Sequence, residues 1–317
     1  MKKLLLLAAV LFVALGIIAC QKQTKAEQIR LATGGTTGTY YAYGTALAQI
    51  LTEKTKVPIT VQSSGASKAN IQLMAAGDIE MAMVQNDVME YAWKGVDLFS
   101  GEKTQSFNAM AALYAEVCQV VANPSAGIKT IADLKGKNVS VGDAGSGTEF
   151  NARQILEVYG ITFNDINKQN LGFGPSADAL RDNKIDAFFC VAGAPTPAIV
   201  DLAMNREIVV LDVDDAHAAQ LAKSYPFYTQ YPIPAGSYRG QTGPIKCVAV
   251  KATFIVSPKI SEKTVYELTK ALFSNIPTIT QAHAKGAELS TSYAVAGVST
   301  PFHPGAIKYF KEVGVMK

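Results

Sequence analysis

The sequence is poor in the residues that carry most metal and nucleophilic chemistry. Its 317 residues include three histidines, four cysteines and one tryptophan. The cysteines form no Cys-x-x-Cys pair, and no cysteine and histidine stand at a metal-binding spacing. No Gly-x-Ser-x-Gly elbow is present, and the scattered histidines do not suggest a catalytic triad. We therefore expect no metal, no cofactor and no enzymatic activity.

Charged residues are also few and nearly balanced. They make up 17% of the chain, and the formal charge of +3 includes Lys2 and Lys3 at the N-terminus. The rest of the chain has no cluster of lysine and arginine, so we do not expect nucleic acid as a partner. By contrast, 49% of the residues are hydrophobic. That composition allows two domains of ordinary size or one large domain.

The N-terminus has the features of an export signal. Two lysines precede an apolar stretch that is shorter than the roughly 20 residues of a membrane-spanning helix. We interpret residues 1–19 as a signal peptide. The residues up to Cys20 resemble the bacterial lipobox, whose cysteine is acylated; ordinary cleavage near a chance cysteine is the alternative. The lipid on Cys20 and a tether over residues 20–25 would hold the exported protein in the periplasm or at the outer face of the cytoplasmic membrane.

The remaining cysteines are Cys118, Cys190 and Cys247, and each lies in an apolar run. These surroundings favour buried free thiols. A disulfide between Cys118 and Cys247 is the alternative in an exported protein.

A small-residue loop organises the first part of the chain. Residues 34–40, Gly-Gly-Thr-Thr-Gly-Thr-Tyr, stand between an expected strand over 29–33 and an expected helix over 40–51. Glycines permit a tight turn and a close ligand approach, and the free N–H groups of a helix start attract an anion. A capped turn without a ligand is the alternative. A dinucleotide site is not indicated, because the next strand ends in Gln62 rather than in a ribose-binding acid.

A second loop of the same kind lies in residues 143–148, between an expected strand over 138–142 and an expected helix over 149–159. The alternation of strands and helices predicts parallel α/β sheets. Ligands of open α/β sheets bind beyond the carboxyl ends of the strands, where both loops would lie. We therefore predict two α/β lobes with a ligand cleft between them.

Two long β-rich runs would join the lobes. Residues 107–122 are apolar over too great a length for one simple strand, so we expect two successive strands or one bent strand that crosses between the lobes. Residues 245–255 would return to the first lobe. Residues 225–243 are rich in proline, tyrosine and glycine and are expected to be irregular.

The order and spacing of several short motifs resemble those of the TAXI proteins, the extracytoplasmic solute receptors of one branch of TRAP transporters. The motifs cover nearly all of the mature chain and are TGGTTGTYY (33–41), AAGD (75–78), MVQND (83–87), GSGT (145–148), AFFCVAG (187–193), YPFY (225–228), IPAG (233–236) and PFHPGA (301–306). The resemblance implies an α/β, two-lobed periplasmic binding protein fold of type II. Each lobe would be a mostly parallel sheet flanked by helices.

The resemblance also implies the lobe boundaries and the partners. Lobe 1 would comprise residues 26–120 plus 245–317, and lobe 2 would comprise residues 121–244. The protein would be a monomer that binds a small carboxylate or amino acid, such as glutamate or 2-oxoglutarate, when the lobes close. It would then deliver this ligand to a TRAP membrane permease with fused large and small subunits.

We predict that both lobes contact the ligand. The candidate residues of the first lobe are Gly35, Thr36, Thr37, Tyr40, Ser64 and Gln85. Those of the second lobe are Ser146, Gly147, Thr148 and Gly193. Backbone N–H groups and hydroxyl groups from both sides would bind a carboxylate and bridge the lobes.

Each of these residues has a structural alternative. Gly147 and Thr148 would also suit a capped turn without a ligand. Tyr40 would also suit a hydrophobic core, and Gln85 would also suit the cap of the helix that follows it.

The charged residues near the loops do not determine whether the ligand is an anion or also carries an amine. The loops contain no arginine, and Arg153 would face solvent or pack along its helix, so dipoles alone would meet an anion. Asp143 or Glu149 would meet a ligand amine, which would favour an amino acid. A solvated or helix-terminal carboxylate is the simpler interpretation of both residues.

Other functions stay open beside the TRAP receptor. An ABC-importer receptor or a sensor-associated binding protein for another small anion would need the same fold and cleft. An enzyme, such as a transferase with a phosphate cradle, would need a base and a nucleophile facing the cleft. The sequence offers no credible pair of this kind.

Overall fold

The structure is a computed structural model and describes residues 28–317. The predicted signal peptide over 1–19, the predicted acylation site Cys20 and the tether over 20–25 lie outside the described residues. Within 28–317, no helix is both long and apolar enough to cross a membrane.

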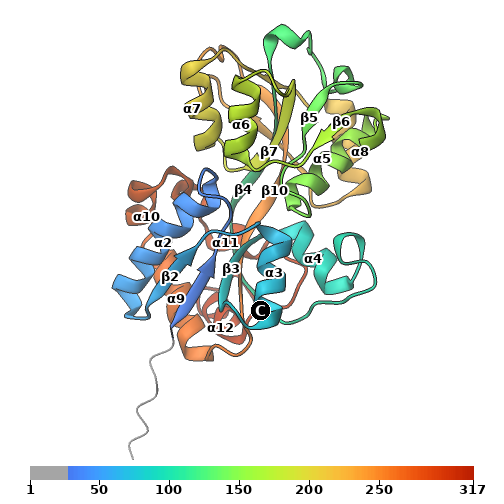
Figure 1. Cartoon of the computed structure of the whole chain (residues 1–317). Coiled ribbons are helices and arrows are strands. Elements are labelled where there is room, and N and C mark those ends of the chain that lie inside the picture. Colours follow the sequence, from blue (N-terminus) through green and yellow to red (C-terminus); the bar gives the residue numbers. More distant parts are fainter. Residues whose placement is uncertain (1–27) are drawn as a thin grey trace, which may run out of the picture.

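Two α/β bodies are stacked along one continuous sheet (Figure 1). The strand order is β2-β1-β3-β10-β4-β7-β5-β6, while β8 pairs with β4 and β9 pairs with β10. The strands are β1 (Ile29–Ala32), β2 (Ile59–Gln62), β3 (Met81–Gln85), β4 (Asn108–Ala122), β5 (Asn138–Ser140), β6 (Asn167–Gln169), β7 (Ala187–Ala192), β8 (Val209–Leu211), β9 (Thr229–Ile233) and β10 (Ile245–Val256).

The α-helices cover both faces of this sheet. They are α2 (Thr39–Thr55), α3 (Ser67–Ala76), α4 (Asn86–Lys94), α5 (Gly147–Val158), α6 (Phe173–Arg181), α7 (Pro197–Asn205), α8 (Asp215–Ser224), α9 (Glu262–Ser274), α10 (Ile276–Ala282), α11 (Thr291–Val295) and α12 (Pro304–Glu312). We call the part with β1–β3, α2–α4 and α9–α12 the first body, and the part with β5–β8 and α5–α8 the second body.

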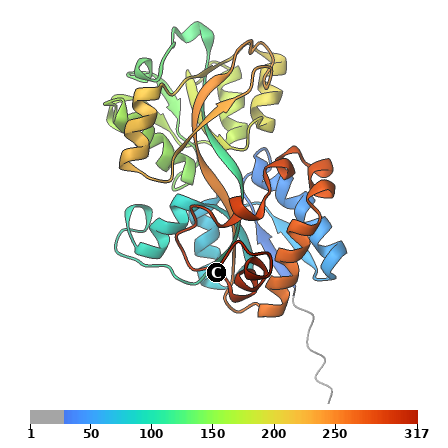
Figure 2. The ribbon, with the colours of Figure 1, turned by 180° about the vertical axis from the view of Figure 1, so that it is seen from behind.

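In the first body, β3 divides its side chains between two hydrophobic layers. Met81 and Met83 pack with residues of α2, α9 and α12, whereas Ala82 and Val84 pack with residues of α3 and α4. Successive strand residues point to opposite faces, so helices are needed on both sides of the parallel β1, β2 and β3. Figure 2, the view from behind, shows the C-terminal segment packed on the face of this body that points away from the viewer in Figure 1.

The second body is built in the same way around β7. Phe189 packs with residues of α5 and α8, and Phe188 packs with residues of α6 and α7. Strands β5, β6 and β7 run parallel, as the alternation of strands and helices predicted. The bodies therefore repeat one architecture.

The long strands β4 and β10 run through both bodies and pair antiparallel. Residues 107–122 contain one strand, β4, rather than two, and its register with β10 shifts twice, between Ala252 and Thr253 and between Phe254 and Ile255. Such shifts bend a strand without ending it. A single strand therefore crosses between the bodies.

The expectation of an irregular segment over 225–243 is wrong in part, because β9 lies within it and pairs antiparallel with β10. Pro232 lies in this strand opposite Lys246. A proline cannot donate a ladder hydrogen bond, but it is tolerated in a strand at the edge of a sheet.

The three cysteines in the described part of the chain are free and buried. Cys118 and Cys247 are therefore not joined by a disulfide. Burial raises the pKa of each thiol.

Candidate functional site

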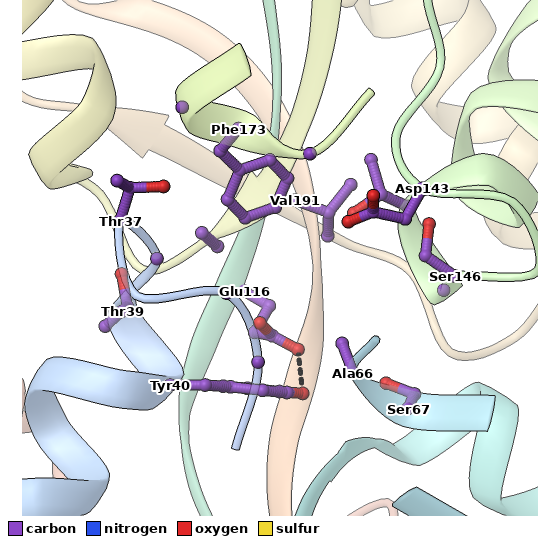
Figure 3. A pocket seen from close by; sticks show the side chains of 18 of the residues that line it. Thr37, Thr39, Tyr40, Ala66, Ser67, Glu116, Asp143, Ser146, Phe173 and Val191 are labelled. Carbon is purple, nitrogen blue, oxygen red and sulfur yellow. Dashed lines mark hydrogen bonds between the residues drawn. The ribbon is translucent and has the colours of Figure 1, made fainter. Parts of the chain in front are cut away.

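A cavity of about 200 Å³ lies between the two bodies (Figure 3). Its wall is formed by the 34–40 loop, the start of α3, the end of β3, the middle of β4, the 143–148 loop, the start of α6 and the end of β7. The carboxyl ends of the parallel strands thus meet at the cavity, as expected for an open α/β sheet.

Most of the predicted ligand-binding residues line this cavity. They are Gly35, Thr36, Thr37, Tyr40, Gln85, Ser146, Gly147 and Thr148. The structure brings these residues together from both bodies; whether they touch a ligand stays a prediction.

Ser64 and Gly193 do not belong to the cavity wall. The Ser64 hydroxyl donates to the Thr33 carbonyl oxygen at 3.0 Å, so it ties neighbouring strand ends together. The Gly193 carbonyl oxygen accepts a hydrogen bond from Thr39 Oγ1 at 3.0 Å, which joins α2 to the second body. Gly193 therefore supports the contact between the bodies.

The 34–40 loop places the start of α2 at the cavity. Gly38 is the N-cap residue, and no side chain caps this helix. A Cβ atom on Gly38 would stand 3.3 Å from the Phe173 ring of the second body. The glycine thus permits a close approach of the bodies, and the uncapped N–H groups of the first helical turn face the same region.

The 143–148 loop places the start of α5 at the opposite wall. The Ser146 side chain caps this helix by accepting a hydrogen bond from the Glu149 N–H at 3.1 Å. The cap is therefore Ser146, and not Thr148 as the capped-turn alternative supposed. A Cβ atom on Gly147 would stand 1.8 Å from Gln85 Oε1, so a side chain at this position would displace the Gln85 amide.

Gln85 does not cap the helix that follows it. It occupies the N-cap position of α4 without a side-chain cap bond. Its side chain is 3% exposed, and Oε1 has no hydrogen-bond partner among the described residues. Most buried acceptors in folded proteins have a hydrogen-bond partner, so this unpaired oxygen is an exception.

Glu116 is a charged wall residue that the sequence analysis did not predict. It lies in the middle of β4, is 2% exposed, and its Oε2 accepts a hydrogen bond from the Tyr40 hydroxyl at 2.6 Å (Figure 3). Burial raises the pKa of this carboxyl to about 8. The signal in the sequence was a single acid within a largely apolar strand of fifteen residues.

Asp143 also lines the cavity, as the amine alternative required. Burial raises the pKa of its carboxyl. Glu149 does not line the cavity: it accepts from the Gly145 N–H at 2.6 Å and pairs with Lys168 at 2.8 Å.

No lysine, arginine or histidine is among the residues that line the cavity within 28–317. Arg153 does not simply face solvent: it pairs with Asp97 of the first body at 2.7 Å and with Glu157 at 3.0 Å. The buried Lys285 approaches Gly193, but its Nζ pairs with Glu288 at 2.6 Å. An anion in the cavity would therefore meet backbone N–H groups and hydroxyls.

Helices α4 and α5 join the bodies beside the cavity. Asn151 donates to Asp87 Oδ2 at 3.0 Å and to the Tyr228 hydroxyl, and Gln154 donates to the Tyr91 hydroxyl at 2.9 Å. Burial raises the pKa of Asp87 to about 6. The structure is thus a closed arrangement in which polar side chains of both bodies are hydrogen-bonded.

The fold is shared with periplasmic binding proteins of known structure. The alkanesulfonate-binding protein SsuA from Xanthomonas axonopodis pv. citri, bound to MOPS, is 15% identical, with a TM-score of 0.52 and 90% of each chain covered. PhnD1 from Prochlorococcus marinus, in complex with methylphosphonate, is 8% identical, with a TM-score of 0.57, covering 82% of this chain and 90% of that one.

A binding protein component of an ABC phosphonate transporter from Pseudomonas aeruginosa is 13% identical, with a TM-score of 0.51, covering 82% of this chain and 79% of that one. These likenesses confirm the predicted two-lobed type II periplasmic binding protein fold. They do not single out the TAXI proteins. The NMT1-like family model matches residues 31–314, nearly all of the described chain, and the protein therefore belongs to the NMT1-like family.

Proposed function

We propose that this protein is an extracytoplasmic solute-binding protein that closes around a small anion and releases it unchanged. One observation carries the proposal: α2 and α5 belong to different bodies, and both begin at the cavity wall. The N-terminus of a helix attracts an anion through its free N–H groups and its dipole. An anion between the two helix starts would hold the bodies together.

The size and lining of the cavity support a small ligand with a compact acidic group. A volume of about 200 Å³ leaves little room beyond a headgroup and a short aliphatic part. The structural neighbours named above were described with a sulfonate buffer and with methylphosphonate. We therefore propose a sulfonate, phosphonate or carboxylate headgroup.

We propose an ATP-driven importer as the partner in the membrane, because a neighbour of the same fold is described as a component of an ABC phosphonate transporter. The TRAP permease and a dicarboxylate ligand are the alternative that the motif resemblance predicts. Uptake that stops when ATP is depleted but persists when the ion gradient is collapsed would separate the two.

We keep three further predictions as proposals. The lobe boundaries lie at 120/121 and 244/245, within or next to the crossing strands. The protein is exported, and Cys20 is acylated. Mass spectrometry of the membrane-extracted protein tests the acylation directly.

A thermal-shift screen with ethanesulfonate, methylphosphonate and small carboxylates tests the binding function. Ligand at 100 times its Kd adds about 2.7 kcal/mol of apparent stability, which raises Tm by several degrees. Thr148→Val should weaken binding by about tenfold or more, because it removes a hydroxyl next to the bound charge. Thr60→Val, in β2 and away from the cavity wall, is the matched control.

The proposal fails if none of these anions raises Tm. The anion site at α5 fails if Thr148→Val binds as tightly as the control variant does.

A further inference from the structure

We infer that the ligand also carries a protonated amine, which binds Glu116 and Gln85 while its acidic group lies at the starts of α2 and α5. The inference rests on the proposed function and specifies its ligand class, a small zwitterion. Glu116, which lies in none of the sequence motifs, would then determine the specificity for a ligand amine.

The first observation is the position of Glu116. Its carboxyl lies in the cavity wall at the middle of β4, and the strand residues on either side of it are apolar. Burial of a carboxyl without a cationic partner costs free energy. Figure 3 shows the Tyr40 hydroxyl bonded to one of its oxygens, so a neutral donor is present where a cation would be expected.

The second observation is independent of the first. Gln85 lies in the same wall, and its Oε1 is buried and has no donor among the described residues. An ammonium group has three N–H donors and can satisfy several acceptors at once. A ligand with only an anionic group and carbon atoms would leave this oxygen unpaired, at a cost in affinity.

The third observation concerns charge across the cavity. Asp143 enters the wall from the second body, so that both bodies present a carboxyl group (Figure 3). The wall contains no cationic side chain within the described range that would neutralise either acid. Lys285 and Arg153 are already paired with Glu288 and Asp97. A cation supplied by the ligand completes the site.

The helix starts and the carboxyl groups thus recognise opposite charges. A helix start without a cationic side chain accepts an anionic headgroup. A carboxyl group accepts an ammonium group through charge-assisted hydrogen bonds. A ligand with both groups on a short aliphatic spacer satisfies both and fits the small volume.

Matched ligand pairs test the inference by isothermal titration calorimetry on the purified protein. The pairs are taurine and propanesulfonate, 2-aminoethylphosphonate and propylphosphonate, and β-alanine and butyrate. Within each pair, one compound has an ammonium group where the other has a methyl group. In at least one pair, the amine-bearing member should bind at least tenfold more tightly.

Glu116→Gln should lower this preference by tenfold or more. Glu267→Gln, on the exposed side of α9, is the matched control and should keep the preference. If Glu116→Gln does not fold, Asp143→Asn is used instead and should lower the preference in the same direction.

The outcomes separate the inference from the proposed function. Amine-free members that bind as tightly as their partners overturn the inference and retain the anion-binding function. A preference that a folded Glu116→Gln variant leaves unchanged also overturns it, and Asp143→Asn decides in the same way if Glu116→Gln does not fold. Binding by no member of any pair overturns the proposed function for these headgroups, and the inference with it.

Discussion

At the scale of single residues, Glu116 shows how burial changes the chemistry of a side chain. Its carboxyl is in a low-dielectric strand interior, where the charged form is disfavoured, and its pKa rises to about 8. Tyr40 and Lys285 act in the opposite direction, by a hydrogen bond and by charge, but do not offset the effect of burial.

This shift predicts a pH dependence of folding stability. The folded protein holds the Glu116 proton more tightly than the unfolded chain, so the contribution of Glu116 to stability is greatest below its ordinary pKa and declines as pH rises toward 8. Glu116→Gln removes this dependence. Relative to wild type, the variant should gain up to a few kcal/mol in free energy of unfolding between pH 5 and pH 8.

Urea unfolding of the ligand-free wild type and variant at both pH values measures the difference. A stability difference that is the same at pH 5 and pH 8 would contradict the assignment.

The residue scale also shows what local patterns predict about the site. Gly35, Thr36, Thr37, Gly147 and Thr148 were found because a glycine-rich turn before a helix is visible in the sequence. Glu116 was missed because a lone acid in an apolar strand carries no motif. Its role in the site depends on which loops pack around β4.

At the scale of elements, the contact between α4 and α5 determines how the bodies meet. Asp87 of α4 and Asn151 of α5 are both fully buried, and the Asp87 Oδ2 oxygen has Asn151 as its donor. Arg153 lies on the same helix, but its pair with Asp97 is partly exposed. Asp97 follows α4, in the short 3-10 helix Asp97–Phe99, so the second contact joins α5 to the segment after α4 in more exposed surroundings.

This contrast predicts unequal effects of two alanine variants. Asn151→Ala leaves a buried oxygen without its donor and should lower the free energy of unfolding by about 1–3 kcal/mol. Arg153→Ala, the control on the same helix, should cost about 1 kcal/mol or less, because exposed ion pairs contribute little.

Urea unfolding of both variants at one pH gives the comparison. Equal losses would show that the buried hydrogen bond does not determine the contact between α4 and α5.

Element identity was predicted best where the pattern was local. The helices after both glycine loops, and the parallel strands around them, follow from side-chain periodicity and turn residues. β9 was missed because Pro232 and its neighbours are typical of a loop; the strand forms because β10 offers it a partner. The continuity of β4 was likewise decided by pairing, since β7, β8 and β10 all bond to it.

At the scale of the whole molecule, β4 and β10 are the long strands shared by both bodies, and the cavity lies where the bodies meet. Fold relatives close such an interface by a hinge motion. At Gly147, where α5 of the second body meets Gln85 of the first, a Cβ atom would overlap the Gln85 side chain.

Gly147→Ala should therefore keep the bodies apart while leaving each body folded. We expect ligand affinity to fall by about tenfold or more, and the decrease in radius of gyration on ligand binding to disappear. Small-angle X-ray scattering with and without ligand measures the second effect.

Gly243→Ala is the matched control, since a Cβ atom there meets nothing within 4 Å. Ligand-induced compaction that persists in Gly147→Ala would show that Gln85 moves aside and that this position does not limit closure.

The sequence by itself determined the α/β class, the two repeated units and the two loops at the strand ends. These features depend on interactions between neighbours in the chain, such as alternation along a strand, spacing along a helix and the torsional freedom of glycine. Only the tertiary structure brought Glu116, Gln85 and Asp143 into one cavity wall and left Ser64 and Gly193 outside it. Those positions depend on the pairing of β4 and β10 and on the contact of two bodies, which are interactions between residues far apart in the chain.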